Sequence, residues 1–178
     1  MRTLMLALCS ALLVGAACAA PTPAADPCSG FKWDVDKERA LFSGQSTTLA
    51  AGKDIAAAPV VGADRLYQLQ LTPQTDVTFA LPPGKKMLTD GAYAGLAKLN
   101  LDVAGNYRVS VDVPLWIDVA VDGKLAATRD FQGQQGCDAP HKVVEFDLSG
   151  AKNYVLQLSA SSQASVRVTV TQAPAPKL

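Results

Sequence analysis

Histidine is almost absent from this chain, because His141 is the only one among its 178 residues. One histidine excludes an iron site of two histidines and a carboxylate, and it excludes the His-Glu-x-x-His zinc motif. A Ser-His-Asp triad would have to use His141, yet no Gly-x-Ser-x-Gly motif occurs. His141 stands between Pro140 and Lys142 at the expected start of a strand, which favours a solvated surface residue. We therefore expect no catalytic residue, no metal site and no cofactor.

The chain also lacks an excess of charge, since 16 Lys and Arg residues balance 16 Asp and Glu residues. Nucleic-acid binding needs concentrated positive charge to neutralise phosphates, and attachment to an anionic membrane surface has the same requirement. A phosphate-binding loop is missing as well. Gly84-Lys85-Lys86 has neither the preceding glycine nor the following Ser or Thr of that motif. We therefore expect no nucleic-acid partner.

Long apolar runs are missing after Ala20, so we predict no transmembrane segment in the mature chain. Before that point, Arg2 is followed by an uncharged apolar stretch over residues 4–17 and by small residues. This order is typical of a secretory signal peptide, which we predict over residues 1–20. The prediction makes the protein an exported one, located in the periplasm.

The end of the leader allows a second interpretation. Gly15-Ala16-Ala17-Cys18 resembles a bacterial lipobox, although Gly15 stands where that motif usually has Leu or another branched residue. In this alternative Cys18 is the lipid-bearing first residue and anchors the protein to the outer membrane. The Pro-rich linker over residues 21–27 suits either case as a polar tether.

Cysteine is scarce, and only Cys28 and Cys137 remain of four once the leader is removed. An even number of cysteines in an exported protein predicts one disulfide bond. Closing a loop of roughly 110 residues should stabilise the fold by about 4 to 5 kcal/mol in the chain-entropy model. The alternative is a pair of free or metal-binding thiols, and zinc is disfavoured because a structural site needs about four ligands.

No segment shows a long apolar stripe of helical period, and residues 37–42 form at most a turn or two. Apolar and polar residues instead alternate with the period of half-buried strands. Asp122-Gly123 lies between two alternating runs and indicates a hairpin. The predicted strands cover residues 31–35, 67–71, 77–81, 99–103, 107–113, 115–121, 144–148, 154–158 and 166–170. Short strands at this spacing predict an all-β fold, an antiparallel jelly-roll-like β-sandwich. The domain is expected over residues 28–172, with a flexible tail over residues 173–178.

The first predicted strand begins beside Cys28. Phe31, Trp33 and Val35 share one face of it, so we expect this strand to insert into the sandwich. Cys137 falls in a glycine-rich loop before the strand at 144–148. The disulfide would pin the first strand to that loop, which is a stabilising role.

Carboxylates offer two weaker hypotheses. The candidates for the acid pair of a glycoside hydrolase are Asp112, Asp118, Glu145 and Asp147. Each alternates with apolar residues, which favours solubilising charges on the outer faces of strands. A calcium site using Asp118, Asp122 and the Asp130 region is the second, but the spacing fits no EF-hand or repeat-type loop. Asp122 is better explained as the first residue of its turn.

The most informative group is Leu115-Trp116-Ile117-Asp118. If Leu115 and Ile117 face the core, Trp116 and Asp118 point outward side by side. An exposed indole beside a carboxylate suits carbohydrate binding, because the ring stacks on a sugar while the acid accepts hydroxyl hydrogen bonds. The alternative is a bulge at Pro114 that resets the phase and makes Trp116 a core or edge-covering residue. Trp116 and Asp118 are therefore the candidate ligand-binding residues.

Three short motifs carry a resemblance to a known type of domain. They are Gly105-Asn106-Tyr107-Arg108-Val109, Ile117-Asp118-Val119 with Asp122-Gly123, and Asn153-Tyr154-Val155-Leu156 before a closing valine strand. Over roughly residues 67–170 the chain resembles the bacterial pre-peptidase C-terminal domain type. Its members are small exported jelly-roll-like sandwiches attached to secreted proteins. The resemblance implies a sandwich fold outside the cytoplasm.

The opening of the predicted domain carries another resemblance. Cys28-Ser29-Gly30-Phe31-Lys32-Trp33-Asp34-Val35, followed by Glu38 and Leu41-Phe42, is similar to a family of short exported proteobacterial proteins. Automatic labels for such chains sometimes read homogentisate 1,2-dioxygenase. That enzyme is a much longer cytosolic cupin whose iron needs two histidines and a carboxylate. Because this chain has only His141, the label does not fit it.

Together these observations predict a non-catalytic envelope protein that binds a glycan or a partner protein in the periplasm. Two alternatives stay open. One is a structural accessory whose sheet edge docks onto a larger envelope complex. The other is an enzyme whose site is assembled from acids that the sequence does not single out. An exposed Trp116 favours the binding module, whereas a buried Trp116 favours the accessory.

Overall fold

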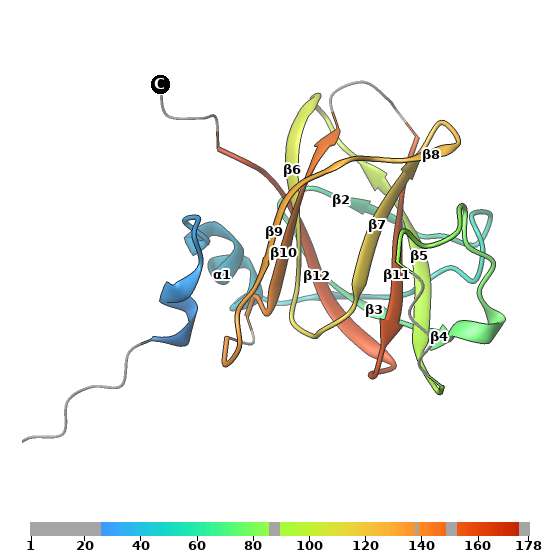
Figure 1. The fold of residues 1–178 in the computed structure, drawn as a ribbon, viewed down its shortest axis with the longest axis horizontal. Coiled ribbons are helices and arrows are strands. Elements are labelled where there is room, and N and C mark those ends of the chain that lie inside the picture. The colour runs from blue at the N-terminus through green and yellow to red at the C-terminus, as the bar shows by residue number, and fades with distance from the viewer. Residues whose placement is uncertain (1–25, 86–89, 138, 149–152, 175–178) are drawn as a thin grey trace, which may run out of the picture.

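The computed structural model describes residues 26–85, 90–137, 139–148 and 153–174. Two six-stranded sheets pack face to face, so the predicted all-β sandwich is confirmed (Figure 1). Sheet A has the order β1 (Thr47–Ala50), β3 (Leu66–Gln70), β12 (Ser165–Gln172), β6 (Gly105–Val111), β10 (Lys142–Leu148), β9 (Thr128–Gly133). Sheet B has the order β2 (Val60–Gly62), β5 (Tyr93–Asn100), β11 (Tyr154–Ser161), β7 (Trp116–Val121), β8 (Lys124–Leu125), and β4 (Thr72–Pro73) pairs with β5. The helical elements are η1 (Pro27–Gly30), α1 (Asp36–Phe42) and η2 (Gln74–Asp76).

The core lies between the two sheets and follows from the alternation in the sequence. Every second residue of the central strands faces inward, as Val109 does on β6, Leu156 on β11 and Val168 on β12, each with no exposed surface. Tyr107 is almost fully buried in this core, and its hydroxyl donates a 2.7 Å hydrogen bond to the carbonyl oxygen of Val103. Burial raises the pKa of the Tyr107 phenol above its ordinary value.

The sheets are mixed, which corrects the prediction of a purely antiparallel sandwich. β1 pairs parallel with β3, and β2 pairs parallel with β5, while the other pairings are antiparallel. The chain passes from β1 in sheet A to β2 in sheet B and back to β3 in sheet A. Because each parallel pair is joined by a connection that leaves its sheet, this geometry needs no tight hairpin. Alternation alone does not distinguish the two directions of pairing.

A predicted strand at residues 77–81 is wrong, because residues 77–85 form an irregular segment that we call the strap. Its apolar side chains pack with Leu96 and Val155 on the outer face of sheet B, forming a separate small cluster. The backbone of Leu81 bonds to a side chain instead of a neighbouring strand. Gln157 accepts from Leu81 N at 2.9 Å and donates to Leu81 O at 3.1 Å. The apolar alternation of the strap therefore serves packing onto a sheet, not pairing within one.

The predicted first strand at residues 31–35 is also wrong. Pro27 begins η1, and the Asp26 side chain accepts from Cys28 N at 2.9 Å, which starts a helical turn. Phe31 and Val35 are buried, but against Cys137 and Val143 and outside the main core. Residues 27–42, which we call the N-terminal cover, thus lie on the outer face of sheet A, where α1 contacts β12 (Figure 1).

Smaller differences concern the ends of elements. β5 covers Tyr93–Asn100, so the predicted strand at 99–103 begins earlier and ends sooner. The hairpin at Asp122-Gly123 is confirmed, with φ of 47° and 73° at its two turn residues and β7 paired to β8. The turn or two predicted at residues 37–42 is the helix α1, which begins one residue earlier, at Asp36. Pro27, placed in the linker, belongs to η1, and the N–H of Ala173 in the predicted tail donates to Asn106 O at 2.8 Å.

The predicted signal peptide and the candidate lipidation site Cys18 lie outside the described residues. Within the part of the chain that the structure describes, no helix is long and apolar enough to cross a membrane.

Candidate functional site

Trp116 and Asp118 lie on β7 with the phase that the sequence predicts. Leu115, Ile117 and Val119 belong to the core, so the two candidates share the outer face of sheet B. The alternative in which Pro114 resets the phase is therefore wrong. A side chain on this outer face is not necessarily exposed to solvent, however, because the strap covers part of the face.

Asp118 is held inside the structure. Its side chain is buried, and only 8% of the residue is exposed. Its Oδ2 atom accepts from the Trp116 indole N–H at 3.0 Å and from the Gly84 N–H of the strap at 2.9 Å. A Cβ atom at position 84 would lie 3.0 Å from Asp118 Oδ1, so the close approach of the strap favours glycine there. Asp118 thus fixes the orientation of the indole and the end of the strap.

Trp116 is half-buried and lines a hollow of about 390 Å³. This volume is at the small end of the range for ligand sites. The residues that line it come from the strap, the start of β7 and the two residues before it, the start of β10 and the residue before it, and the end of β11 with the turn that follows: Lys85, Pro114, Leu115, Trp116, His141, Lys142, Ala160 and Ser162. The hollow therefore joins segments from four parts of the sequence around one indole ring.

Two ammonium groups lie against this ring. Lys142 Nζ is 5.1 Å and Lys85 Nζ is 5.7 Å from the ring centroid, both within the range of cation–π attraction. Lys142 Nζ also donates a 2.9 Å hydrogen bond to Leu115 O, which links sheet A to the start of β7 in sheet B. Burial lowers the pKa of the Lys142 ammonium, and the charge of Lys85 lowers it further, against an opposing effect of Asp118.

Lys85, His141 and Lys142 are not among the candidate site residues that the sequence predicts. The prediction of a solvated surface position for His141 is corrected, because this residue is partly buried at the wall of the hollow. Lys85 belongs to Gly84-Lys85-Lys86, which lacks the pattern of a phosphate loop. No local pattern links these residues to Trp116, because Lys85 lies on the strap and Lys142 on the opposite sheet.

A second, apolar hollow of about 160 Å³ lies beside Trp116 at the opening between β7 and β9. The side chains that line it are Trp116, Ile117, Thr128, Phe131, Lys142 and Val144. Phe131 is 64% exposed, although it stands on the edge strand of sheet A. A large apolar residue this exposed on a sheet edge is uncommon, because edges are usually protected by charge or cover.

The carboxylates of the predicted acid pair do not come together. Asp118 lies on sheet B, whereas Glu145 lies on the outer face of sheet A, where it pairs with Arg108 at 3.2 Å and Arg129 at 3.5 Å. Asp112 accepts from Arg167 at 2.8 Å. Three of the four acids therefore serve internal contacts, which corrects their interpretation as solubilising charges. Only Asp147 is exposed as expected.

The calcium hypothesis gains no support from the geometry. Asp122 occupies its turn, and Asp130 forms an ion pair with Lys32, which lowers the pKa of that exposed carboxyl. Among the described residues, no three His, Cys, Asp or Glu side chains form a group that could hold a metal ion.

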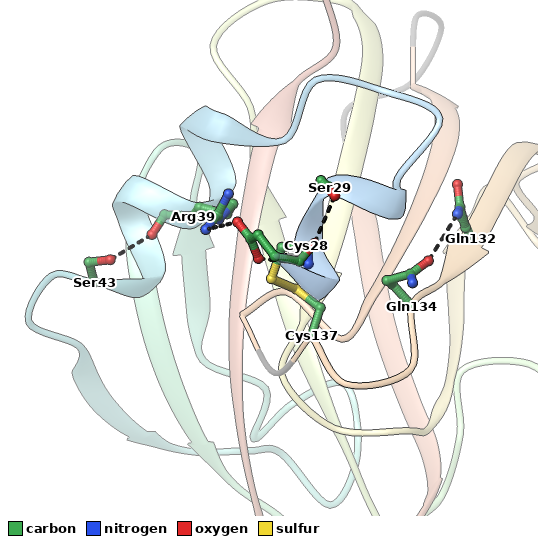
Figure 2. The surroundings of a disulfide bond; sticks show 8 residues. Cys28, Ser29, Arg39, Ser43, Gln132, Gln134 and Cys137 are labelled. Atoms are coloured by element: carbon green, nitrogen blue, oxygen red, sulfur yellow. Dashed lines mark hydrogen bonds and ion pairs between the residues drawn. A yellow bond between two sulfur atoms is a disulfide. The ribbon is translucent and has the colours of Figure 1, made fainter. Parts of the chain in front are cut away.

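The predicted disulfide between Cys28 and Cys137 is confirmed, with Cα atoms 4.9 Å apart and a separation of 109 positions in sequence (Figure 2). It joins η1 to the loop that follows β9, on the side of sheet A away from sheet B. Figure 2 also shows Arg39 of α1 beside this bridge, where its guanidinium lies 2.9 Å from the Asp26 carboxylate. The bridge lies against the outer face of sheet A, whereas Trp116 lies on the outer face of sheet B. The role of the bridge is therefore to hold the N-terminal cover, not to shape the site at Trp116.

No protein-family model matches the chain, and no curated protein matches it either.

Proposed function

We propose that this protein is a non-catalytic binding module of the cell envelope whose ligand is a glycan held in the hollow at Trp116. The observation that carries the proposal is the half-buried indole, fixed by its hydrogen bond to buried Asp118, at the wall of a 390 Å³ hollow. A ring that is already oriented loses little conformational freedom on binding, which favours affinity. Asp118 positions the ring and takes no direct part, since its Oδ2 atom already accepts two hydrogen bonds.

The test is isothermal titration calorimetry with chitotriose, maltotriose and trigalacturonate on the oxidised protein. We expect at least one of these probes to bind, and Trp116→Ala to weaken that binding at least about tenfold because a sugar ring loses its stacking surface. Trp116→Phe keeps an aromatic ring and should lose less.

Trp33→Phe is the matched control, because Trp33 is the other tryptophan and packs with Lys32 and Arg108 beside sheet A. It should bind as the wild type does. Absence of binding by all three probes, or unchanged binding by Trp116→Ala, would overturn the proposal. A lower melting temperature in Trp116→Ala would not, because the substitution also removes a donor from buried Asp118.

Export is part of this proposal, and the disulfide bond supports it, because disulfides persist in oxidising compartments. The measurement is the intact mass of the protein from its native envelope. A mass that corresponds to a chain cleaved after Ala19 or Ala20 supports the periplasmic form. A mass that includes a diacylglycerol adduct on Cys18 identifies an outer-membrane lipoprotein.

A second candidate function is that of an accessory that docks to an envelope complex, and exposed Phe131 on edge strand β9 favours it. A photocrosslinking residue at position 131 should then capture a specific envelope protein. Val60 offers a matched position, because it is 59% exposed on the edge strand of sheet B. Equal capture from both positions, or none from position 131, would argue against docking at β9.

A further inference from the structure

We infer that the hollow at Trp116 selects an acidic sugar, whose carboxylate binds between the ammonium groups of Lys85 and Lys142. The inference rests on the proposed function and adds the chemical class of its ligand.

The first observation is the placement of two like charges on one small ring. Lys85 Nζ and Lys142 Nζ lie 5.7 Å and 5.1 Å from the centroid of the Trp116 ring, so two positive charges share one indole. Each repels the other, and the pKa of Lys142 is lowered partly for this reason. An anion between them would relieve the repulsion and would gain charge-assisted hydrogen bonds from both.

The second observation is that these charges have no carboxylate partner among the residues that the structure describes. Three other lysines do have such a partner: Lys32 pairs with Asp130, Lys37 with Asp64, and Lys53 with Asp76. Within the same described residues, no ion pair involves Lys85 or Lys142. Asp118 influences Lys142 through its charge but directs its Oδ2 atom to Trp116 and Gly84.

The third observation is the composition of the wall. The lining residues include Lys85, Lys142 and His141, and none of them is acidic. The Lys142 ammonium donates one hydrogen bond to a protein acceptor, the carbonyl of Leu115. Because an ammonium carries three donors, two remain for a ligand within the part of the chain that the structure describes. A neutral sugar would satisfy these donors less well than a carboxylate, because hydrogen bonds between charged partners are roughly twice as strong.

The experiment compares trigalacturonate with its fully methyl-esterified form, which has the same sugar rings without the charge. Calorimetry at low salt should show that the acid binds at least about tenfold more tightly than the ester. Lys85→Met and Lys142→Met should each remove most of that difference. Methionine keeps the length and apolar stem of lysine, so packing against Trp116 is retained.

Lys124→Met is the matched control, because Lys124 is exposed on β8 of the same sheet and has no ion pair among the described residues. It should bind both probes as the wild type does. Inorganic phosphate provides a further arm, and competition by phosphate at concentrations similar to the trisaccharide would mean that the pair binds any oxyanion and does not select sugars.

The outcomes separate the inference from the function on which it rests. If acid and ester bind equally, and Trp116→Ala weakens both, the glycan site stands and the selection of an acidic sugar is wrong. If neither probe binds, nor any neutral trisaccharide, both proposals are wrong. Loss of binding by Lys124→Met to the same extent would show a general effect of charge and would also overturn the inference.

Discussion

Asp118 shows how a residue chosen as a ligand contact can instead be a support. Its carboxylate is buried and holds the Trp116 indole and the strap together through two N–H donors. Such a buried acceptor contributes more to the free energy of unfolding than a surface carboxylate does, because its removal leaves two N–H donors without partners.

We expect Asp118→Ala to lower the free energy of unfolding by about 1 to 3 kcal/mol, since the Trp116 N–H loses its partner. Asp118→Asn keeps an acceptor oxygen of the same size and should cost less. Urea unfolding of the three proteins measures the difference. Equal stability of wild type and Asp118→Ala would contradict the supporting role.

Lys142 makes the stability of the protein depend on pH in a definite direction. Burial, and then the charge of Lys85, lowers its pKa in the folded state, so the folded protein loses this proton at lower pH than the unfolded chain. Between the two pKa values the unfolded state binds more protons, and stability therefore rises with pH in that window.

This pH dependence can be tested by comparing the free energy of unfolding of the wild type with that of Lys142→Met across the alkaline range. As pH rises from the lowered pKa of Lys142 towards the ordinary value for lysine, the wild type should gain stability relative to the variant. Free energies of unfolding in urea at several pH values measure this. A difference that stays constant, or that falls with pH, would show that the ammonium is not disfavoured by its surroundings.

The strap and the N-terminal cover are the elements that distinguish this sandwich from two bare sheets. Each lies on an outer face that carries polar residues, and each is held by side chains of that face. On sheet A, Arg108 contacts Glu145 at 3.2 Å and Glu38 of α1 at 4.0 Å, and it donates to Asp34 O at 2.9 Å. On sheet B, Gln157 forms two hydrogen bonds with Leu81.

Gln157→Leu should release the strap without unfolding the sandwich, because leucine has similar volume but neither donor nor acceptor. We expect amide exchange at Leu81 to become roughly 10- to 100-fold faster, as a loss of about 1 to 3 kcal/mol in local opening implies. Hydrogen exchange followed by mass spectrometry measures it. Gln135→Leu, at an exposed loop position, is the control. Unchanged exchange in the strap would show that apolar packing alone holds it.

At the scale of the whole molecule, the disulfide joins the N-terminal cover to the loop after β9 across 109 residues of sequence. We expect the double variant Cys28→Ser with Cys137→Ser to lose about 4 to 5 kcal/mol, because the unfolded chain regains the freedom of a long loop. Urea unfolding with and without a reductant measures this. The variant should not respond to the reductant, and a wild type that is equally unresponsive would contradict the prediction.

The alternation of apolar and polar residues was sufficient to predict most strands, but it gave a wrong result for residues 31–35 and 77–81. Val77, Phe79 and Leu81 have the spacing of a strand, yet they cover a sheet, and Phe31 with Val35 does the same on the other side. A period of two reports which side chains share a face. It does not report whether the backbone finds a partner strand, which depends on distant segments.

The sequence by itself determined the sandwich, the disulfide and the phase of Trp116 and Asp118, because alternation and cysteine number are local or compositional properties. Only the tertiary structure decided that Asp118 is buried and that Lys85 and Lys142 meet at the indole. The reason is physical: Lys85 lies on the strap, Trp116 on sheet B and Lys142 on sheet A. Their meeting depends on how these three segments pack, and no spacing along the chain records it.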